Sequence, residues 1–209
     1  MKINNNILLE VNNLCISTAS KNNVKSLVKN ISFNIRKNEI IGLLGESGSG
    51  KSLTSLAILK LLNKDQFKVS GEILFQEKDL LKIEDYKMLK IRGAEISMIF
   101  QEPMSALNPT MKIGKQISEV YKIHQAKSNF NIQKKIKQLI KKVKLEKVEN
   151  ILQKYPHEIS GGQKQRVMII MALACKPKLL IADEPTTALD LTVQKEIIKI
   201  LQSLQKTEN

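Results

Sequence analysis

The sequence contains few of the residues on which several common classes of protein depend. It has no tryptophan and only two cysteines, and aromatic residues make up 4% of the chain. Cys15 and Cys175 lack the close spacing of metal ligands, so we expect two reduced, partly buried thiols and neither a zinc site nor a disulfide framework. So few aromatic side chains also leave little material for stacking nucleic-acid bases.

Long apolar runs are missing as well. The longest, residues 167–175, is far shorter than the roughly 20 residues of a membrane-spanning helix and suits a buried core helix instead. Residues 1–10 contain one lysine but no apolar core of the kind found in a signal peptide. The sequence therefore predicts a protein that stays in the cytosol.

The net charge of +14 comes mostly from lysine. A basic balance of this size is compatible with a nucleic-acid or membrane-surface partner. The lysines are spread along the chain, however, and charge runs are usually solvated faces, so the sequence favours a solvated basic surface with no nucleic-acid partner. With 42% hydrophobic residues, the 209-residue chain can form one substantial domain around a packed core.

Hydrophobic periodicity predicts alternating strands and helices. Strands are expected at residues 7–16, 32–35, 39–44, 70–75, 94–100 and 179–182, and helices at residues 51–62, 132–143, 161–175 and 192–205. Alternation of this kind argues for an α/β fold with a mainly parallel sheet. Residues 102–175 are interpreted as a mostly helical insertion within a single domain.

The strongest motif is a glycine-rich loop between a predicted strand and a predicted helix. It consists of Gly45, Glu46, Ser47, Gly48, Ser49, Gly50, Lys51 and Ser52, and it matches the spacing of a phosphate-binding loop. Glycines let several backbone N–H groups point at one phosphate chain, and the helix N-terminus adds positive potential. Lys51 would place a point charge on the β- and γ-phosphates, and Ser52 would offer a hydroxyl to Mg²⁺.

Two further motifs carry candidate chemistry. Asp183 and Glu184 follow a predicted strand at the end where open α/β sheets bind ligands; Asp183 suits Mg²⁺ and Glu184 suits activation of a water. The second motif consists of Ser160, Gly161, Gly162 and Gln163. Ser160 is a candidate N-cap, and the two glycines leave the first amides of the helix uncovered. The motif is either a well-capped helix start or a second anion cradle. A second cradle would be useful only if it closed over a nucleotide bound to another copy of the chain.

These motifs together resemble the ABC ATPases over nearly the whole chain. Their order is the phosphate loop, Gln101 after a strand, Ser-Gly-Gly-Gln, Asp-Glu, and then Ala188-Leu189-Asp190. Residues 45–52, 91–109 and 155–160 are similar, more narrowly, to the ATPase subunits of oligopeptide, dipeptide and nickel importers.

The resemblance implies a P-loop NTPase core with an N-terminal antiparallel β subdomain and an inserted helical subdomain. Two ATPase subunits, identical or different, would hold each ATP between the phosphate loop of one and the Ser-Gly-Gly-Gln of the other. Ser52, Gln101 and Asp183 would contact Mg²⁺, Gln101 and Glu184 would be catalytic, and Asp190 would cross the dimer interface. Transmembrane permease subunits would be direct partners and a substrate-binding protein an indirect one, which places the chain at the cytoplasmic face of the membrane.

Some positions depart from the family pattern. Residues 15–19 contain no aromatic side chain to stack on adenine, and Asn38 replaces the usual glycine of a turn. Because asparagine tolerates positive φ, we expect that turn to be kept. The family has a switch histidine at the end of the next core strand, whereas His124 and His157 both precede Asp183. We therefore expect the last core strands to be missing from these 209 residues.

The sequence thus predicts the ATP-hydrolysing subunit of an importer for peptides or nickel. One alternative is a soluble ABC protein acting on nucleic acid or ribosomes, against which the single phosphate loop and the lack of a cysteine cluster argue. The other is a non-catalytic remnant, which the lack of a histidine after Asp190 keeps open.

Overall fold

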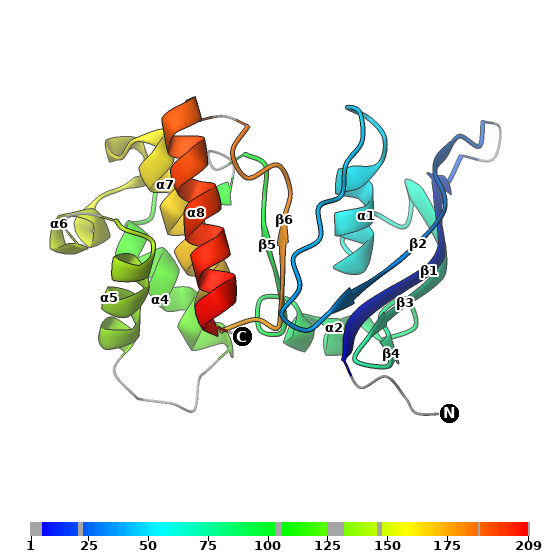
Figure 1. Cartoon of the computed structure of the whole chain (residues 1–209), viewed down its shortest axis with the longest axis horizontal. Coiled ribbons are helices and arrows are strands. Elements are labelled where there is room, and N and C mark those ends of the chain that lie inside the picture. The colour runs from blue at the N-terminus through cyan, green and yellow to red at the C-terminus, as the bar shows by residue number, and fades with distance from the viewer. Residues whose placement is uncertain are drawn as a thin grey trace. The chain divides into compact units, whose positions relative to one another are not determined.

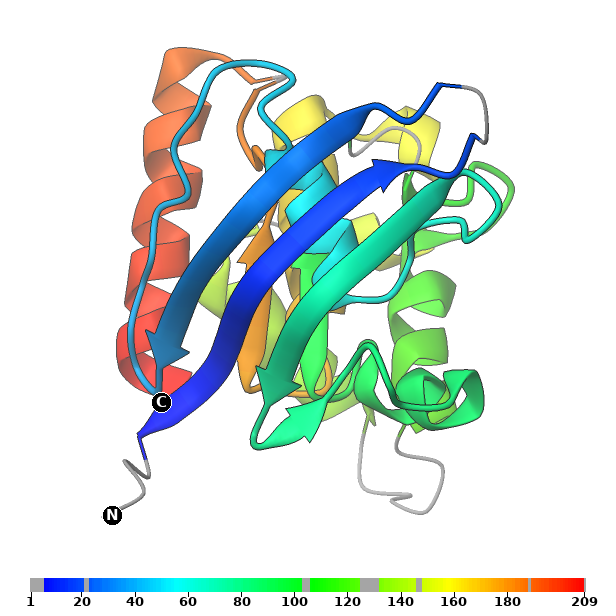
Figure 2. The ribbon, with the colours of Figure 1, turned by 90° about the vertical axis from the view of Figure 1, so that its right-hand side faces the viewer.

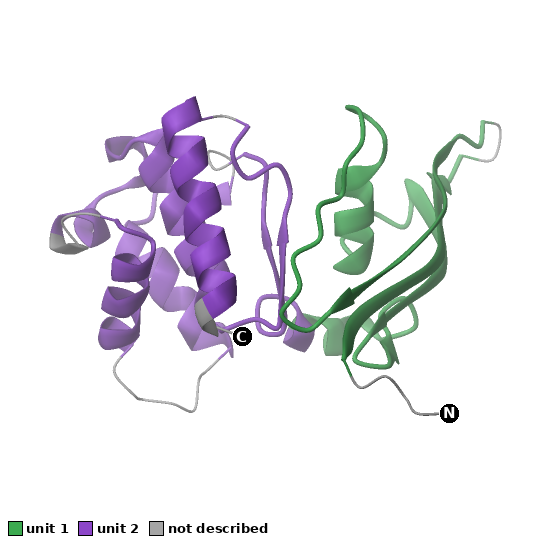
Figure 3. Ribbon diagram, viewed as in Figure 1, with its two compact units in different colours: residues 1–89, 209 green, residues 90–208 purple. Residues whose placement is uncertain are grey.

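The chain folds into two compact units (Figure 3), one of residues 1–89 with residue 209 and one of residues 90–208. The structure is a computed structural model that describes residues 6–20, 23–102, 106–124, 132–145, 148–187 and 189–208. Each unit has its own sheet.

Unit 1 is built on an antiparallel sheet with the strand order β2-β1-β3-β4. Its elements are β1 (Ile7–Thr18), β2 (Ser26–Arg36), α1 (Lys51–Ile58), β3 (Phe67–Phe75) and β4 (Lys78–Asp79). The three long strands run side by side, and α1 lies along one face of the sheet (Figures 1 and 2). The helix α2 (Asp85–Ile91) follows and contains the boundary between the units.

A bulge in β1 keeps its apolar side chains on the core face of this sheet. Leu9 and Val11 point to the core, and all four apolar side chains, with Leu14 and Ile16, are fully buried. In a regular strand, Leu14 and Ile16 would lie on the face opposite to Leu9 and Val11. The register with β2 shifts between Val11 and Leu14, where Asn13 has a φ of 49°. One extra residue in a strand returns the following side chains to the same face. The predicted strands at 7–16, 32–35 and 70–75 are therefore confirmed, each within a longer strand.

The turn after β2 has the conformation that the sequence predicted. Asn38 has a φ of 61°, in the left-handed region where asparagine replaces glycine most readily. The backbone N–H of Arg36 donates to the Glu39 carboxylate at 2.7 Å, which fastens the turn on its other side.

The strand predicted at residues 39–44 is wrong for this structure. These residues have no regular secondary structure, and their side chains are exposed, to 62% for Ile40 and 93% for Leu44. The apolar pattern was a sound reason to expect a buried strand, but a strand also needs a hydrogen-bonding neighbour. In the described part of unit 1, the sheet consists of β1–β4 and none of them pairs with this segment.

Unit 2 combines a parallel pair of strands with a layer of helices. β5 (Ile96–Ile99) and β6 (Leu179–Ala182) pair in parallel. The helical elements are α4 (Ile113–His124), α5 (Ile132–Lys142), α6 (Val148–Gln153), η1 (Pro156–Glu158), α7 (Gly161–Leu173) and α8 (Leu191–Glu208). Ile117, Ile140, Ile169 and Ile197, one from each of four helices, are fully buried in their common core. The predicted strands and helices of this region are confirmed, with shifts at their ends.

Two expectations from composition can be compared with the structure. None of the helices in the described ranges is long and apolar enough to cross a membrane. Cys15 and Cys175 are both half-buried and free. Burial raises the pKa of the Cys175 thiol, and a thiol that resists ionisation is a poor nucleophile.

Candidate functional site

The glycine-rich loop of unit 1 wraps directly into the first turn of α1. Gly50 is the N-cap of this helix with a φ of 96°, and Gly48 also has a left-handed φ of 78°. A Cβ atom at Gly50 would lie 2.5 Å from Val28 Cγ2 and 3.2 Å from the carbonyl oxygen of Leu27. Both the backbone conformation and the close approach of β2 therefore require glycine at this position.

The side chain of Lys51 turns back across the loop that precedes it. Its ammonium donates to the carbonyl oxygens of Gly45 and Glu46, both at 2.9 Å. Ser52 is the next residue of α1, and the Thr54 hydroxyl closes the turn by donating to Gly50 O at 2.9 Å. The residues predicted at 45–52 are thus brought together, with one positive charge held against the loop backbone.

In unit 2 the predicted polar residues gather where the two parallel strands end. Asp183 and Glu184 directly follow β6, and the backbone N–H of Asp183 donates to Ile99 O of β5 at 3.0 Å. Gln101 follows β5, and its amide Nε2 donates to Glu184 Oε2 at 2.8 Å across 83 residues of sequence. The pairing of β5 with β6 therefore positions Gln101 and Glu184 side chain to side chain.

Glu184 has an unusual backbone. Its φ is 43°, in the left-handed region that non-glycine residues seldom adopt. Thr187 fastens this conformation, since its hydroxyl lies 3.1 Å from Glu184 O and 3.2 Å from Glu184 Oε2. Sequence reasoning missed Thr187; the available signal was Pro185, a residue favoured at the second position of a turn, with Thr187 at the fourth position.

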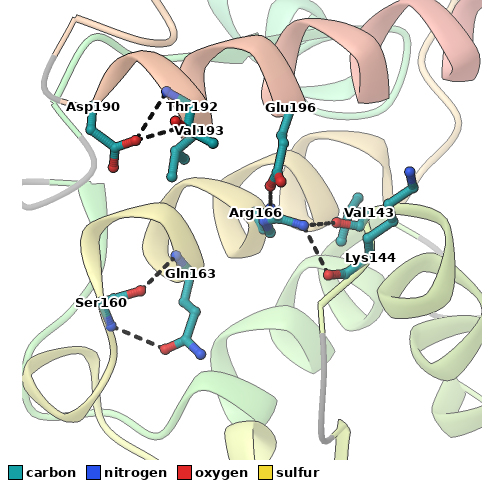
Figure 4. A network of polar contacts seen from close by, with 9 residues as sticks. All are labelled: Val143, Lys144, Ser160, Gln163, Arg166, Asp190, Thr192, Val193 and Glu196. Atoms are coloured by element: carbon teal, nitrogen blue, oxygen red, sulfur yellow. Dashed lines mark hydrogen bonds and ion pairs between the residues drawn. The ribbon is translucent and has the colours of Figure 1, made fainter.

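The Ser-Gly-Gly-Gln motif forms a capping box at the start of α7 (Figure 4). Ser160 Oγ accepts from the backbone N–H of Gln163 at 3.3 Å, and Gln163 Oε1 accepts from the backbone N–H of Ser160 at 3.0 Å. The prediction that Ser160 is an N-cap is confirmed. Asp190 caps α8 in a similar way, since its Oδ1 accepts from the backbone N–H groups of Thr192 and Val193. Of the neighbouring motif residues, Ala188 and residues 103–105 lie outside the described ranges.

Arg166 ties α7 to two other segments of unit 2. Its guanidinium donates to the carbonyl oxygens of Val143 and Lys144 at 2.9 and 2.8 Å and pairs with Glu196 of α8 (Figure 4). A hollow of about 480 Å³ lies here, and its lining includes Ser160, Arg166 and Glu196. Sequence reasoning missed Arg166; the available signal was an arginine immediately before the apolar run at 167–175.

The comparisons with known proteins identify the class of the chain. The family model described as "ABC transporter" matches residues 28–187, so the chain belongs to this family. It is similar to the ATP-binding cassette MJ0796, solved as a dimer in a post-hydrolysis state with ADP and phosphate. The TM-score is 0.80 at 28% identity, over 95% of this chain and 83% of that one. For cbiO1 from Clostridium perfringens, part of the transporter complex cbiONQ, the TM-score is 0.79 at 30% identity, over 96% and 74% of the two chains. The expected α/β P-loop NTPase fold is confirmed.

Curated relatives narrow the similarity further. The chain is 48% identical over 95% of its length to the oligopeptide transport ATP-binding protein OppD of Bacillus subtilis, of which it spans 56%. It is 42% identical over 98% of its length to OppD of Salmonella typhimurium, of which it spans 61%. It is also 42% identical over 95% of its length to the glutathione import ATP-binding protein GsiA of Salmonella typhimurium, of which it spans 33%. The chain therefore spans about three-fifths, or less, of the length of these relatives.

The left-handed backbone at Glu184 gives a prediction on stability. It applies to an extended protein in which residues 1–209 are followed by the C-terminal part of the Bacillus subtilis OppD. We expect Glu184→Gly to unfold about 2–4 °C above Glu184→Ala, because left-handed alanine costs about 1–2 kcal/mol, only partly offset by the backbone entropy of glycine. Thermal unfolding followed by circular dichroism measures the difference. Glu119 lies within α4 and is the control: there the glycine variant should be the less stable one, and the same order at both positions would contradict the prediction.

Proposed function

We propose that the chain is the ATP-binding and ATP-hydrolysing subunit of an importer for peptides. The observation that carries the proposal is the phosphate loop, in which the Lys51 ammonium lies within 2.9 Å of two loop carbonyls and the helix N-terminus follows at Gly50. Such a loop presents N–H groups and a point charge to a phosphate chain. The printed names of the relatives, two oligopeptide transport proteins and a glutathione importer, favour a peptide over nickel as the transported substrate.

The proposed reaction is attack of water on the γ-phosphate of ATP. Residues 45–52 bind the phosphates, Glu184 takes a proton from the water, and Gln101 orients it. Ser52, Gln101 and Asp183 provide hydroxyl, amide and carboxylate oxygens, which are the hard ligands that suit Mg²⁺. Mg²⁺, when bound, supplies charge neutralisation at the phosphates. Catalysis would then consist of positioning and electrostatic stabilisation by these side chains.

The proposed partners rest on the family resemblance and on the interpretation of the start of α7 as a second anion cradle. The capped start of α7, with Ser160 and Gln163, would close over the nucleotide of a second ATPase subunit. The similar cassette MJ0796 has been solved as a dimer. Permease subunits would carry the substrate through the membrane, with the ATPase bound at its cytoplasmic face and a substrate-binding protein reached indirectly.

Removal of the Lys51 ammonium tests the phosphate loop. In the extended protein, we expect Lys51→Ala to weaken ATP binding at least about 30-fold, because truncating one partner of a close charge pair typically costs about 2 kcal/mol or more. Isothermal calorimetry with ATP measures the affinity. Lys64→Ala removes the same charge from a side chain that is 72% exposed and lies outside the loop, and it should leave the affinity unchanged. Equal affinities in the wild type and Lys51→Ala would refute the role of Lys51.

A further inference from the structure

One carboxylate oxygen of Glu184 accepts hydrogen bonds from two different segments. Glu184 Oε2 lies 2.8 Å from Gln101 Nε2 and 3.2 Å from Thr187 Oγ1. Gln101 belongs to the segment that follows β5, whereas Thr187 lies on the turn that Glu184 itself begins. Thr187 therefore moves together with the Glu184 carboxylate, whereas Gln101 belongs to a separate segment and can move independently of it.

Thr187 is fastened to Glu184 by more than its side chain. Its backbone N–H donates to Glu184 O at 3.3 Å, which closes a turn with Pro185 at its second position. Proline is favoured there because its fixed φ suits the turn. The single hydroxyl proton of Thr187 is shared between the carbonyl oxygen and the carboxylate of Glu184. Thr187 therefore contacts both the backbone and the side chain of Glu184, the residue with the left-handed φ.

A restraint of this kind has a use in the proposed reaction. A base that takes a proton from water needs an oxygen that faces the water, and Oε2 of Glu184 is shared with the amide of Gln101. If Gln101 turns toward the water, the Glu184 side chain loses the hydrogen bond from Gln101. The local bond from Thr187 remains, because the four-residue turn of residues 184–187 moves with Glu184, the residue that begins it.

We propose that Thr187 is a positioning residue that holds the carboxylate of Glu184 in place during ATP hydrolysis. The inference rests on the proposed function, since it presumes that Glu184 is the base. It concerns the hydroxyl alone: valine has nearly the shape of threonine without the donor, and serine keeps the donor without the methyl group.

The test compares Thr187→Val with Thr187→Ser in the extended protein. We expect Thr187→Val to lower kcat about tenfold with the KM for ATP within about twofold, because a misplaced base slows the chemical step without changing substrate binding. Thr187→Ser should restore at least half of the wild-type kcat. Thr192→Val, an exposed position at the start of α8, is the control and should leave kcat unchanged. Phosphate release at saturating ATP measures kcat.

The possible outcomes separate this inference from the proposed function. Wild-type kcat in Thr187→Val, or an equally slow Thr187→Ser, would overturn the role of the hydroxyl while ATP hydrolysis by the wild type left the proposed function standing. A parallel rise in KM, or a loss of thermal stability in Thr187→Val that Thr187→Ser shares, would mean a structural role and would also overturn it. No phosphate release from the wild-type extended protein would overturn both proposals together.

Discussion

Glu184→Gln in the extended protein is expected to stop ATP turnover and to leave ATP binding intact. The amide oxygen of glutamine can still accept the hydrogen bonds of Gln101 and Thr187, so the geometry of the turn is kept. The amide cannot take a proton from water, and loss of a general base typically costs about 10²- to 10⁴-fold in rate. Phosphate release should fall by this amount, while calorimetry should give an ATP affinity within about twofold of the wild type.

The same variant tests the proposed dimer, in which each ATP lies between two ATPase subunits. With hydrolysis stopped, ATP should accumulate in the complex, and sizing chromatography with ATP should show a dimer. Adding Ser160→Arg removes the N-cap hydroxyl of α7 and places a bulky side chain at the candidate cradle. We expect the dimer to disappear while each subunit keeps its own ATP affinity, because the phosphate loop is untouched. A Glu184→Gln protein that stays monomeric with ATP would contradict the two-subunit model for this chain.

A protein of residues 1–209 alone is expected to lack both a cooperative unfolding transition and ATPase activity. The reason lies in residues 39–44, where Ile40, Ile41, Leu43 and Leu44 are exposed by 43–93%. Burying a side chain of this size contributes about 1.5–3 kcal/mol, so four of them amount to roughly 6–12 kcal/mol. The net stability of a domain is only about 5–15 kcal/mol. The family resemblance implies a further core strand next to this segment, which the extended protein would supply.

The substitution Leu44→Lys tests whether the exposed residues 39–44 are the cause of this instability. In the 209-residue protein Leu44 is 93% exposed, so the substitution removes an exposed apolar side chain and should reduce aggregation. In the extended protein, where the segment would become a buried strand, the same lysine should lower the free energy of unfolding by several kcal/mol, on the order of an unpaired buried charge. Thermal unfolding and phosphate release on both lengths measure these effects. A cooperative transition and ATP turnover from residues 1–209 alone would contradict the expectation.

Local signals in the sequence were sufficient for the features that depend on neighbouring residues. The loop at 45–52 leads into α1, Ser160 is the N-cap of α7, and Asn38 adopts a positive φ, as the residue types predicted. Each of these follows from backbone chemistry within a few positions, where side-chain type largely decides the conformation.

Features that depend on distant partners could not be predicted in the same way. The apolar pattern at 39–44 indicated a strand, but pairing is decided by what lies beside the segment. The contacts of Arg166 with Val143, Lys144 and Glu196 join three segments that only the folded chain brings together. Thr187 was within reach of local reasoning, but a hydroxyl in a turn is too common to point to a carboxylate.

The packing of α8 on α7 has a consequence for sequence variation. A Cβ atom at Gly162 would lie 3.0 Å from Val193 Cγ1, so the two positions compete for the same small volume. A larger residue at 162 would fit without displacing the helices only beside a smaller one at 193. In an alignment of homologues, the sizes of these two residues should therefore vary in opposite directions, and Gly162→Ala should be tolerated better together with Val193→Ala than alone.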